Sequence, residues 1–138
     1  NTDFGRVARH RKSIDAGNVK LIFNILPEAA KYLADRDIVE IAKSTVFNCK
    51  ADALCVSGLT AGSETNSQIL KRVKDTVPDT VVLANTGCRP DTIEAQLSVA
   101  DGAVVGTTFK VDGKFENGVD EKRVREFMSI VKKFRGQE

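Results

Sequence analysis

The sequence predicts an α/β fold in which parallel strands alternate with helices. Short, almost wholly apolar runs occur four times, and each is followed by an amphipathic run with helical spacing. Strands separated by helices imply right-handed crossovers between parallel strands, and wholly apolar strands are typical of a parallel sheet. The chain of 138 residues is about one domain, and 41% apolar residues suffice for a core.

The first helix is expected over residues 4–16 and the first strand over residues 19–26. Asp35 is expected to cap the next helix, because apolar residues then recur on one helical face. That face comprises Ile38, Ile41, Ala42, Val46 and Cys49.

The second strand is expected over residues 53–57, followed by a glycine-containing loop over residues 58–62. This loop is not a P-loop, because no Lys-Ser/Thr pair follows its second glycine. It is read either as a loop that touches a ligand or as a plain connection. Ser63 is the expected N-cap of the next helix. Its buried face comprises Ile69, Leu70, Val73 and Val77.

The third and fourth strands are expected over residues 80–84 and 102–106, with a short helix between them over residues 91–99. Asp112-Gly113 between extended residues predicts a β-hairpin. Asp120 is expected to cap the final helix. The predicted buried face of that helix comprises Val124, Phe127, Met128 and Val131.

Two architectures fit this order of elements. One is an open, doubly wound sheet of flavodoxin type. The other is half of a (β/α)8 barrel, since a whole barrel needs about 250 residues. Half a barrel would leave unpaired strand edges and an exposed apolar interior face. Such a half would have to dimerise, pair with a missing half, or be a piece of a longer chain.

Ligands bind at the carboxyl ends of the strands in either architecture. The ends of the last two strands both carry a glycine beside small hydroxyl residues. Glycine lets a backbone approach a ligand closely, and successive N–H groups at such a turn attract an anion. We therefore predict a phosphate site at Thr86, Gly87, Gly106, Thr107 and Thr108. The same turns could instead serve only tight connections. Further candidate ligand contacts are Asn24, Ser57, Asn85 and Lys110.

No catalytic residue can be assigned from the sequence. The one histidine, His10, lies in a basic helical stretch, so neither a Ser-His-Asp triad nor a histidine metal site is expected. No two carboxylates are spaced as a general acid and base pair would be. Asp101 precedes the fourth strand, at the amino end of the sheet, where residues of such folds serve stability rather than catalysis. Cys88 is read as a small residue filling a turn rather than as a reactive thiol, and Arg89 either pairs with an anion or faces solvent. We expect no metal and no cofactor.

Composition argues against several classes of protein. The 21 basic and 19 acidic residues nearly balance, which argues against a nucleic-acid binder. No apolar run approaches the roughly 18 residues of a membrane span, and the polar opening is unlike a signal peptide. Three cysteines without CxxC spacing predict reduced thiols and a cytoplasmic location. Because no methionine opens the chain, we expect a fragment or a processed form.

Several segments together resemble the BtpA/SgcQ family. They are Ala-Asp-Ala-Leu-Cys-Val-Ser-Gly at residues 51–58, Thr-Ala-Gly at 60–62, Ala-Asp-Gly-Ala-Val-Val-Gly-Thr at 100–107 and Lys-Val-Asp-Gly-Lys at 110–114. Val119-Asp120, Arg123-Val124 and Phe127-Met128 complete the resemblance. It covers nearly the whole chain and corresponds to the second half of a family member. The Lys-Val-Asp-Gly-Lys segment and the residues after it are its most specific part.

The resemblance implies a TIM barrel related to ribulose-phosphate-binding barrels. Residues 1–138 would be a single partial domain, the C-terminal half of that barrel formed by four βα units. The phosphate-contacting roles of related barrels map onto Gly87, Gly106 and Thr107. The expected function is binding of a phosphate or sugar phosphate, by a metabolic enzyme in its full form. The alternative is a non-catalytic assembly factor, because the family's cyanobacterial namesake is tied to photosystem I biogenesis. The expected partners are a phosphorylated small molecule and a second copy or the missing N-terminal half.

Overall fold

The computed structural model describes residues 3–27, 32–58 and 66–137. Helices and strands alternate along the whole chain, which confirms the predicted α/β class. The elements are α1 (Phe4–Ser13), β1 (Ile22–Leu26), α2 (Ile38–Cys49), β2 (Ala53–Ser57), α3 (Ser67–Thr76), β3 (Val81–Asn85), α4 (Ile93–Leu97), β4 (Gly102–Val104), the 3₁₀ turns η1 (Thr107–Phe109) and η2 (Val111–Gly113), and α5 (Glu121–Phe134).

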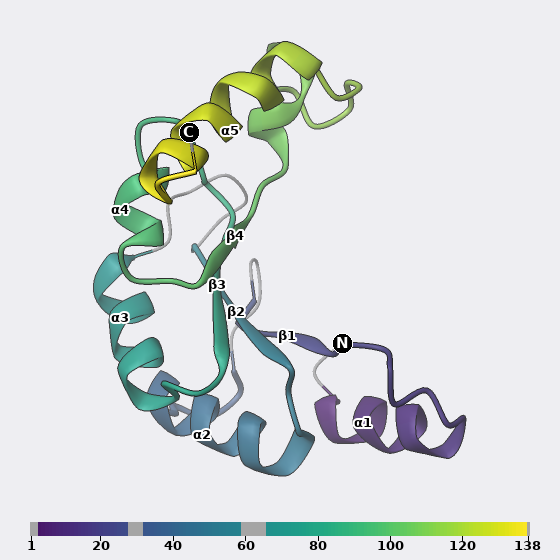
Figure 1. Cartoon of the computed structure of the whole chain (residues 1–138). Helices are drawn as coiled ribbons and strands as arrows, with labels where there is room; N and C mark the ends of the chain where they lie inside the picture. Colours follow the sequence, from purple (N-terminus) through teal and green to yellow (C-terminus); the bar gives the residue numbers. More distant parts are fainter. Residues whose placement is uncertain (1–2, 28–31, 59–65, 138) are drawn as a thin grey trace.

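The four strands form one parallel sheet in the order β1-β2-β3-β4. A doubly wound sheet reverses its strand order at a switch point, whereas a barrel adds each new strand beside the last. Helices α2, α3 and α4 all lie on one side of the sheet (Figure 1). The flavodoxin-type alternative is therefore wrong, and the four βα units have the arrangement of half a (β/α)8 barrel.

The hydrophobic core lies between the sheet and the helices. Alternate strand residues such as Phe23, Leu54 and Val82 point to this side and are buried there with residues of α2 and α3. Helix α1 joins the core at the β1 edge, where Phe4 stacks on Phe23 with ring centroids 4.4 Å apart. Burial of these side chains supplies most of the driving force for folding.

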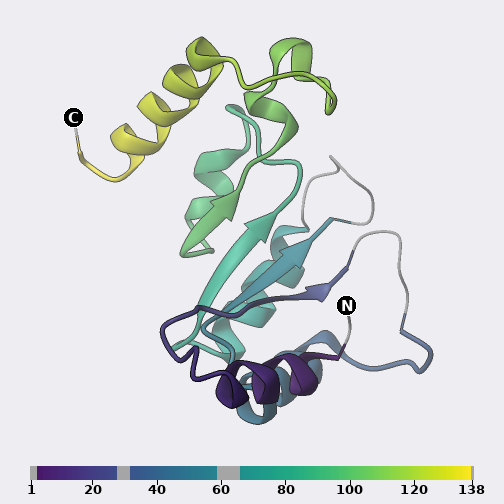
Figure 2. The same ribbon diagram turned by 90° about the vertical axis from the view of Figure 1, so that its right-hand side faces the viewer.

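The other alternate strand residues form what we call the inner face, opposite the helices. Figure 2 shows the sheet turned by 90°, with α1 and α2 near the lower end of its strands. On the inner face Ile22, Val81 and Val104 are 54%, 44% and 43% exposed. Half a barrel is expected to leave apolar surface uncovered, and these three residues agree with that expectation, whereas Ala53 and Cys55 on the inner face of β2 are buried.

Two aspartates hold the amino ends of the strands. Asp52 Oδ2 accepts hydrogen bonds from Leu21 N at 2.8 Å and from Arg11 Nη1 at 2.7 Å. Asp101 Oδ2 accepts from Val82 N at 2.8 Å and from Lys74 Nζ at 2.7 Å. Asp52, just before β2, thus contacts both the backbone just before β1 and helix α1. Asp101, just before β4, contacts both the backbone of β3 and helix α3. The structure confirms that Asp101 lies at the amino end of the sheet.

Several predicted boundaries shift. The first strand begins at Ile22 rather than at residue 19, because the backbone at residue 21 bonds to the Asp52 carboxylate before the ladder starts. The cap of α2 is Asp37, not Asp35, since Asp37 accepts from Val39 N. Helix α3 is capped by Asn66, whereas the predicted cap Ser63 lies outside the described residues. Strand β4 ends at Val104, two residues short of the prediction.

The segment after β4 is a turn rather than an extended hairpin. Asp112 and Gly113 both have positive φ, +56° and +66°, as a tight two-residue turn requires. The flanking residues form only one antiparallel bridge, between Lys110 and Val119. Asp120 caps α5 as predicted, and Phe127 is buried, but Met128 is exposed. The predicted apolar face of α5 is therefore one residue too wide.

Gln96 on α4 is buried, and neither Nε2 nor Oε1 of its side chain has a hydrogen-bond partner among the described residues. A buried polar group without a partner costs about 1–3 kcal/mol. We expect Gln96→Leu to raise the free energy of unfolding by about 1–2 kcal/mol in urea denaturation. Gln68→Leu on the exposed surface of α3 is the control and should give no gain. A destabilised Gln96→Leu variant would contradict the prediction.

Within the residues that the structure describes, no helix is long and apolar enough to cross a membrane.

Candidate functional site

Three polar side chains meet on the inner face: Ser57 and Asn85 end β2 and β3, and Asn24 lies in the middle of β1. Asn24 Nδ2 and Asn85 Nδ2 each donate to Ser57 Oγ over 2.7 Å. Ser57 and Asn85 are register partners in neighbouring strands, and Asn24 reaches Ser57 from the other side. Because side chains alternate across a strand, all three point away from the helix-covered core. The structure thus brings together three of the four predicted ligand contacts.

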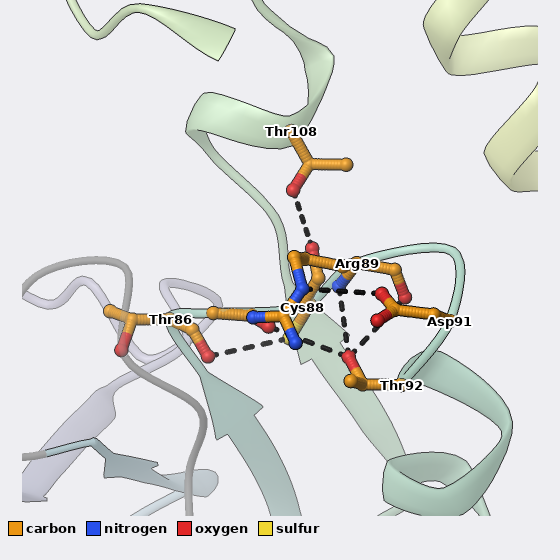
Figure 3. Close-up of polar contacts among 7 residues, drawn as sticks. Thr86, Cys88, Arg89, Asp91, Thr92 and Thr108 are labelled. Carbon is orange, nitrogen blue, oxygen red and sulfur yellow. Dashed lines mark hydrogen bonds and ion pairs between the residues drawn. The ribbon is translucent and has the colours of Figure 1, made fainter.

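The loop after β3 has a strained backbone. Thr86 and Gly87 both have positive φ, +65° and +67°. A β-branched residue rarely adopts this left-handed conformation, which costs about 1–3 kcal/mol and often occurs at ligand sites. Cys88 follows, buried, with its Sγ 3.8 Å from the Thr86 carbonyl oxygen (Figure 3). The loop therefore turns away from the sheet immediately after Asn85.

The loop after β4 lies beside it. Gly106 is exposed, and a Cβ built on it would meet nothing within 4 Å. In turn η1, Phe109 N donates to the Gly106 carbonyl oxygen. Among the described residues, the N–H groups of Thr107 and Thr108 have no backbone acceptor. This loop therefore offers two backbone donors next to an open glycine.

Hydrogen bonds fix the two loops to one another. Thr108 Oγ1 donates to the Cys88 carbonyl oxygen over 2.6 Å (Figure 3). Arg123 Nε of α5 donates to the Thr108 carbonyl oxygen over 2.8 Å. Arg123 is a site residue that the strand-end pattern misses, because it comes from a helix. Its position three residues after the Asp120 cap is the one sequence signal that places it beside the preceding turn.

Other predicted residues do not join this arrangement. Lys110 lies at the junction of η1 and η2, where its backbone pairs with Val119 beyond the strand end. Arg89 is exposed, and its Nε contacts Asp91 Oδ1 at 3.2 Å, so it pairs with its own loop. His10 is exposed on α1. In the glycine-containing loop, residues 59–62 lie outside the described residues.

The described inner face offers hydrogen bonds rather than ionised groups. Cys55 of β2 is the register partner of Asn24 and precedes Ser57 on the inner face, and burial raises the pKa of its thiol, which favours the protonated form. In the described part of the chain, no three histidine, cysteine or acidic side chains gather to hold a metal ion. The amide and backbone N–H groups described here can donate hydrogen bonds to oxygen atoms of a ligand. A general acid or base is not among the described side chains of the inner face.

The chain is similar to several known proteins. It is 63% identical to the putative sgc region protein SgcQ of Escherichia coli, over 95% of this chain and 49% of that protein. It is 31% identical to an uncharacterized mitochondrial protein of Caenorhabditis elegans, over 92% of this chain and 46% of that protein. The photosystem I biogenesis protein BtpA of Synechocystis is 24% identical over 89% of this chain and 42% of its own length.

The chain thus spans about half the length of the curated relatives it matches. That share agrees with four of the eight βα units of a barrel. The model of the BtpA family matches residues 1–133, which includes all four strands and nearly all of α5. Together with the 63% identity to SgcQ, this match shows that the chain belongs to the BtpA family.

Proposed function

We propose that this chain binds the phosphate group of a small metabolite at the loops that follow β3 and β4. The observation that carries the proposal is the pairing of these loops. One has successive left-handed residues at Thr86 and Gly87, and the other offers the N–H groups of Thr107 and Thr108 beside Gly106. Backbone donors grouped in this way attract anions. The loops after the last two strands are also where barrels commonly bind phosphate.

The bonds between the loops support the same proposal. Thr108 ties its loop to Cys88, and Arg123 holds the Thr108 carbonyl group. Donors that are fixed before a ligand arrives lose little conformational entropy on binding. The strain at Thr86 is of the kind that persists where the surrounding structure enforces it for a function. We take the intact protein to be a metabolic enzyme whose acid and base come from outside the described inner face.

Gly106→Ala tests the phosphate site. The added methyl group would meet no protein atom, but it would occupy the space in which a phosphate approaches the backbone. Because Gly106 has φ −117° and ψ −97°, which other residues seldom adopt, the melting temperature of the variant is measured beside its Kd. We expect the Kd of the intact protein for inorganic phosphate to rise at least about tenfold, a loss of about 1.4 kcal/mol. Isothermal titration calorimetry measures it.

Gly118→Ala is the matched control, because its added methyl group also meets nothing within 4 Å. It should change neither the melting temperature nor the Kd. If the intact wild-type protein binds no phosphate at millimolar concentration, or if Gly106→Ala binds it equally well, the proposal is wrong.

A second candidate function is a non-catalytic role in the assembly or stability of another complex. The uncovered apolar inner face supports it, with Ile22, Val81 and Val104 exposed, and so does the similarity to a photosystem I biogenesis protein. The same face would also suit a second copy of this chain, or the further βα units of a longer polypeptide, as its partner. An intact protein that binds no phosphate but co-purifies with one specific complex would favour this second candidate.

A further inference from the structure

The row formed by Asn24, Ser57 and Asn85 fixes the orientation of two carboxamides. Both Nδ2 groups donate to the same oxygen, Ser57 Oγ. Asn24 Oδ1 in turn accepts from Leu26 N over 3.2 Å. Since the nitrogen of each amide points toward Ser57, neither amide can flip without losing a hydrogen bond.

Ser57 and the two asparagines differ in exposure. Ser57 is only 1% exposed, so it cannot itself meet a ligand. Asn24 and Asn85 are half-buried and border the open inner face. Each amide nitrogen carries two hydrogens, and Ser57 takes one from each. The second Nδ2 hydrogen of Asn24 has no acceptor among the described residues. Ser57 is therefore a positioning residue that orients the Asn24 amide donor at the border of the open inner face.

Among the residues that the structure describes, the side chains around the row are uncharged. The next inner-face positions below it belong to Cys55, Leu83 and Gly102, and Val104 of β4 lies beside Asn85. A ligand group that rests on the row would meet the Asn24 amide donor and, among the described residues, no ionised side chain. Neutral oxygen atoms, such as hydroxyl or carbonyl oxygens, match such a donor.

We propose that Asn24, Ser57 and Asn85 form a subsite for the neutral, oxygen-bearing part of the same ligand whose phosphate lies at the β3 and β4 loops. Asn85 immediately precedes Thr86, so the row continues directly from the phosphate loop toward β1. The ligand is then a phosphorylated polyol or sugar, and its carbon chain extends from the β3 and β4 loops toward Asn24 of β1. This inference rests on the proposed phosphate site.

The test compares two probes by calorimetry on the intact protein: ribose 5-phosphate, which carries hydroxyl groups, and ethyl phosphate, which does not. In the wild type we expect ribose 5-phosphate to bind at least about tenfold more tightly, as one or two extra hydrogen bonds would provide. In Asn24→Leu and in Ser57→Ala this advantage should fall below about threefold, while the Kd for ethyl phosphate stays within about twofold. Ser98→Ala, which removes an exposed hydroxyl bonded only to the Ala95 carbonyl oxygen, is the control and should keep the full advantage.

The possible outcomes separate the two proposals. If ethyl phosphate binds but ribose 5-phosphate binds no more tightly, the subsite is wrong and the phosphate site stands. An advantage that survives both Asn24→Leu and Ser57→Ala also overturns the subsite. If neither probe binds, the phosphate site is wrong and the subsite falls with it. Asn24 lies on the edge strand β1, so its variant carries the test if Ser57→Ala does not fold.

Discussion

Phe127→Ala is expected to lower the free energy of unfolding by about 3–5 kcal/mol, the usual cost of removing a buried aromatic side chain. Phe127 is 2% exposed and is the largest fully buried side chain of α5. Its ring meets the Phe109 ring edge to face, with centroids 5.1 Å apart. The substitution removes both the buried surface and this ring contact. Urea denaturation followed by circular dichroism measures the loss.

The same substitution should also weaken phosphate binding. Phe109 belongs to η1, the turn that carries Thr107 and Thr108. When α5 packs less firmly on this turn, the backbone donors lose their fixed position. The control is Phe115→Ala, since that ring is 81% exposed and should cost less than about 0.5 kcal/mol. Equal losses in the two variants would show that α5 contributes nothing through this contact.

Asp52→Ala is expected to cost about 2–3 kcal/mol at neutral pH. The carboxylate accepts from the Leu21 backbone and from Arg11, and hydrogen bonds to charged groups are the stronger kind. The variant leaves the Leu21 N–H without its acceptor and Arg11 without its counter-charge. Asp79→Ala, on the exposed turn after α3, is the control and should stay within about 0.5 kcal/mol of the wild type.

The cost of Asp52→Ala should depend on pH. The Leu21 N–H, and then the Arg11 guanidinium, lower the pKa of Asp52 to about 2. A lowered pKa in the folded state means that the stabilisation is complete above the unfolded pKa, about 4, and disappears as the pH falls toward 2. Asp101 acts in the same direction. Desolvation raises its pKa, but the Lys74 ammonium group and the Val82 N–H outweigh that effect and lower it. Wild type and Asp52→Ala should therefore converge in stability near pH 2, and curves that stay parallel down to that pH would contradict this account.

The sequence predicts the order of the elements well because each strand is a short apolar run and each helix has one apolar face. Strand β2 matches its predicted bounds, 53–57, since apolar residues occupy both of its faces. Strand ends are less predictable when a side chain competes for the backbone. The Asp52 carboxylate takes the N–H of residue 21, and this contact between distant residues is invisible to a local pattern.

In the candidate site, too, some contacts can be predicted from the local sequence and others depend on distant parts of the chain. Asn24, Ser57 and Asn85 could be placed together from sequence, because the carboxyl ends of neighbouring parallel strands meet. Arg123 could not, since its contact with Thr108 depends on how α5 returns to the turn after β4. Lys110 was close in sequence to the fourth strand end, but turn η1 carries it beyond that end. Contacts between neighbouring strands can thus be predicted from the sequence, whereas the contact of α5 with the turn after β4 cannot.

The two aspartates at the amino end of the sheet make matching contacts in two pairs of strands. Asp52 binds the backbone at residue 21 and a cation of α1, and Asp101 binds the backbone of Val82 and a cation of α3. These two sets of hydrogen bonds occupy equivalent positions in the strand pairs β1–β2 and β3–β4, and an Ala-Asp dipeptide precedes both β2 and β4. The same kind of contact thus ties β1 to β2 and β3 to β4 at the amino ends of the strands.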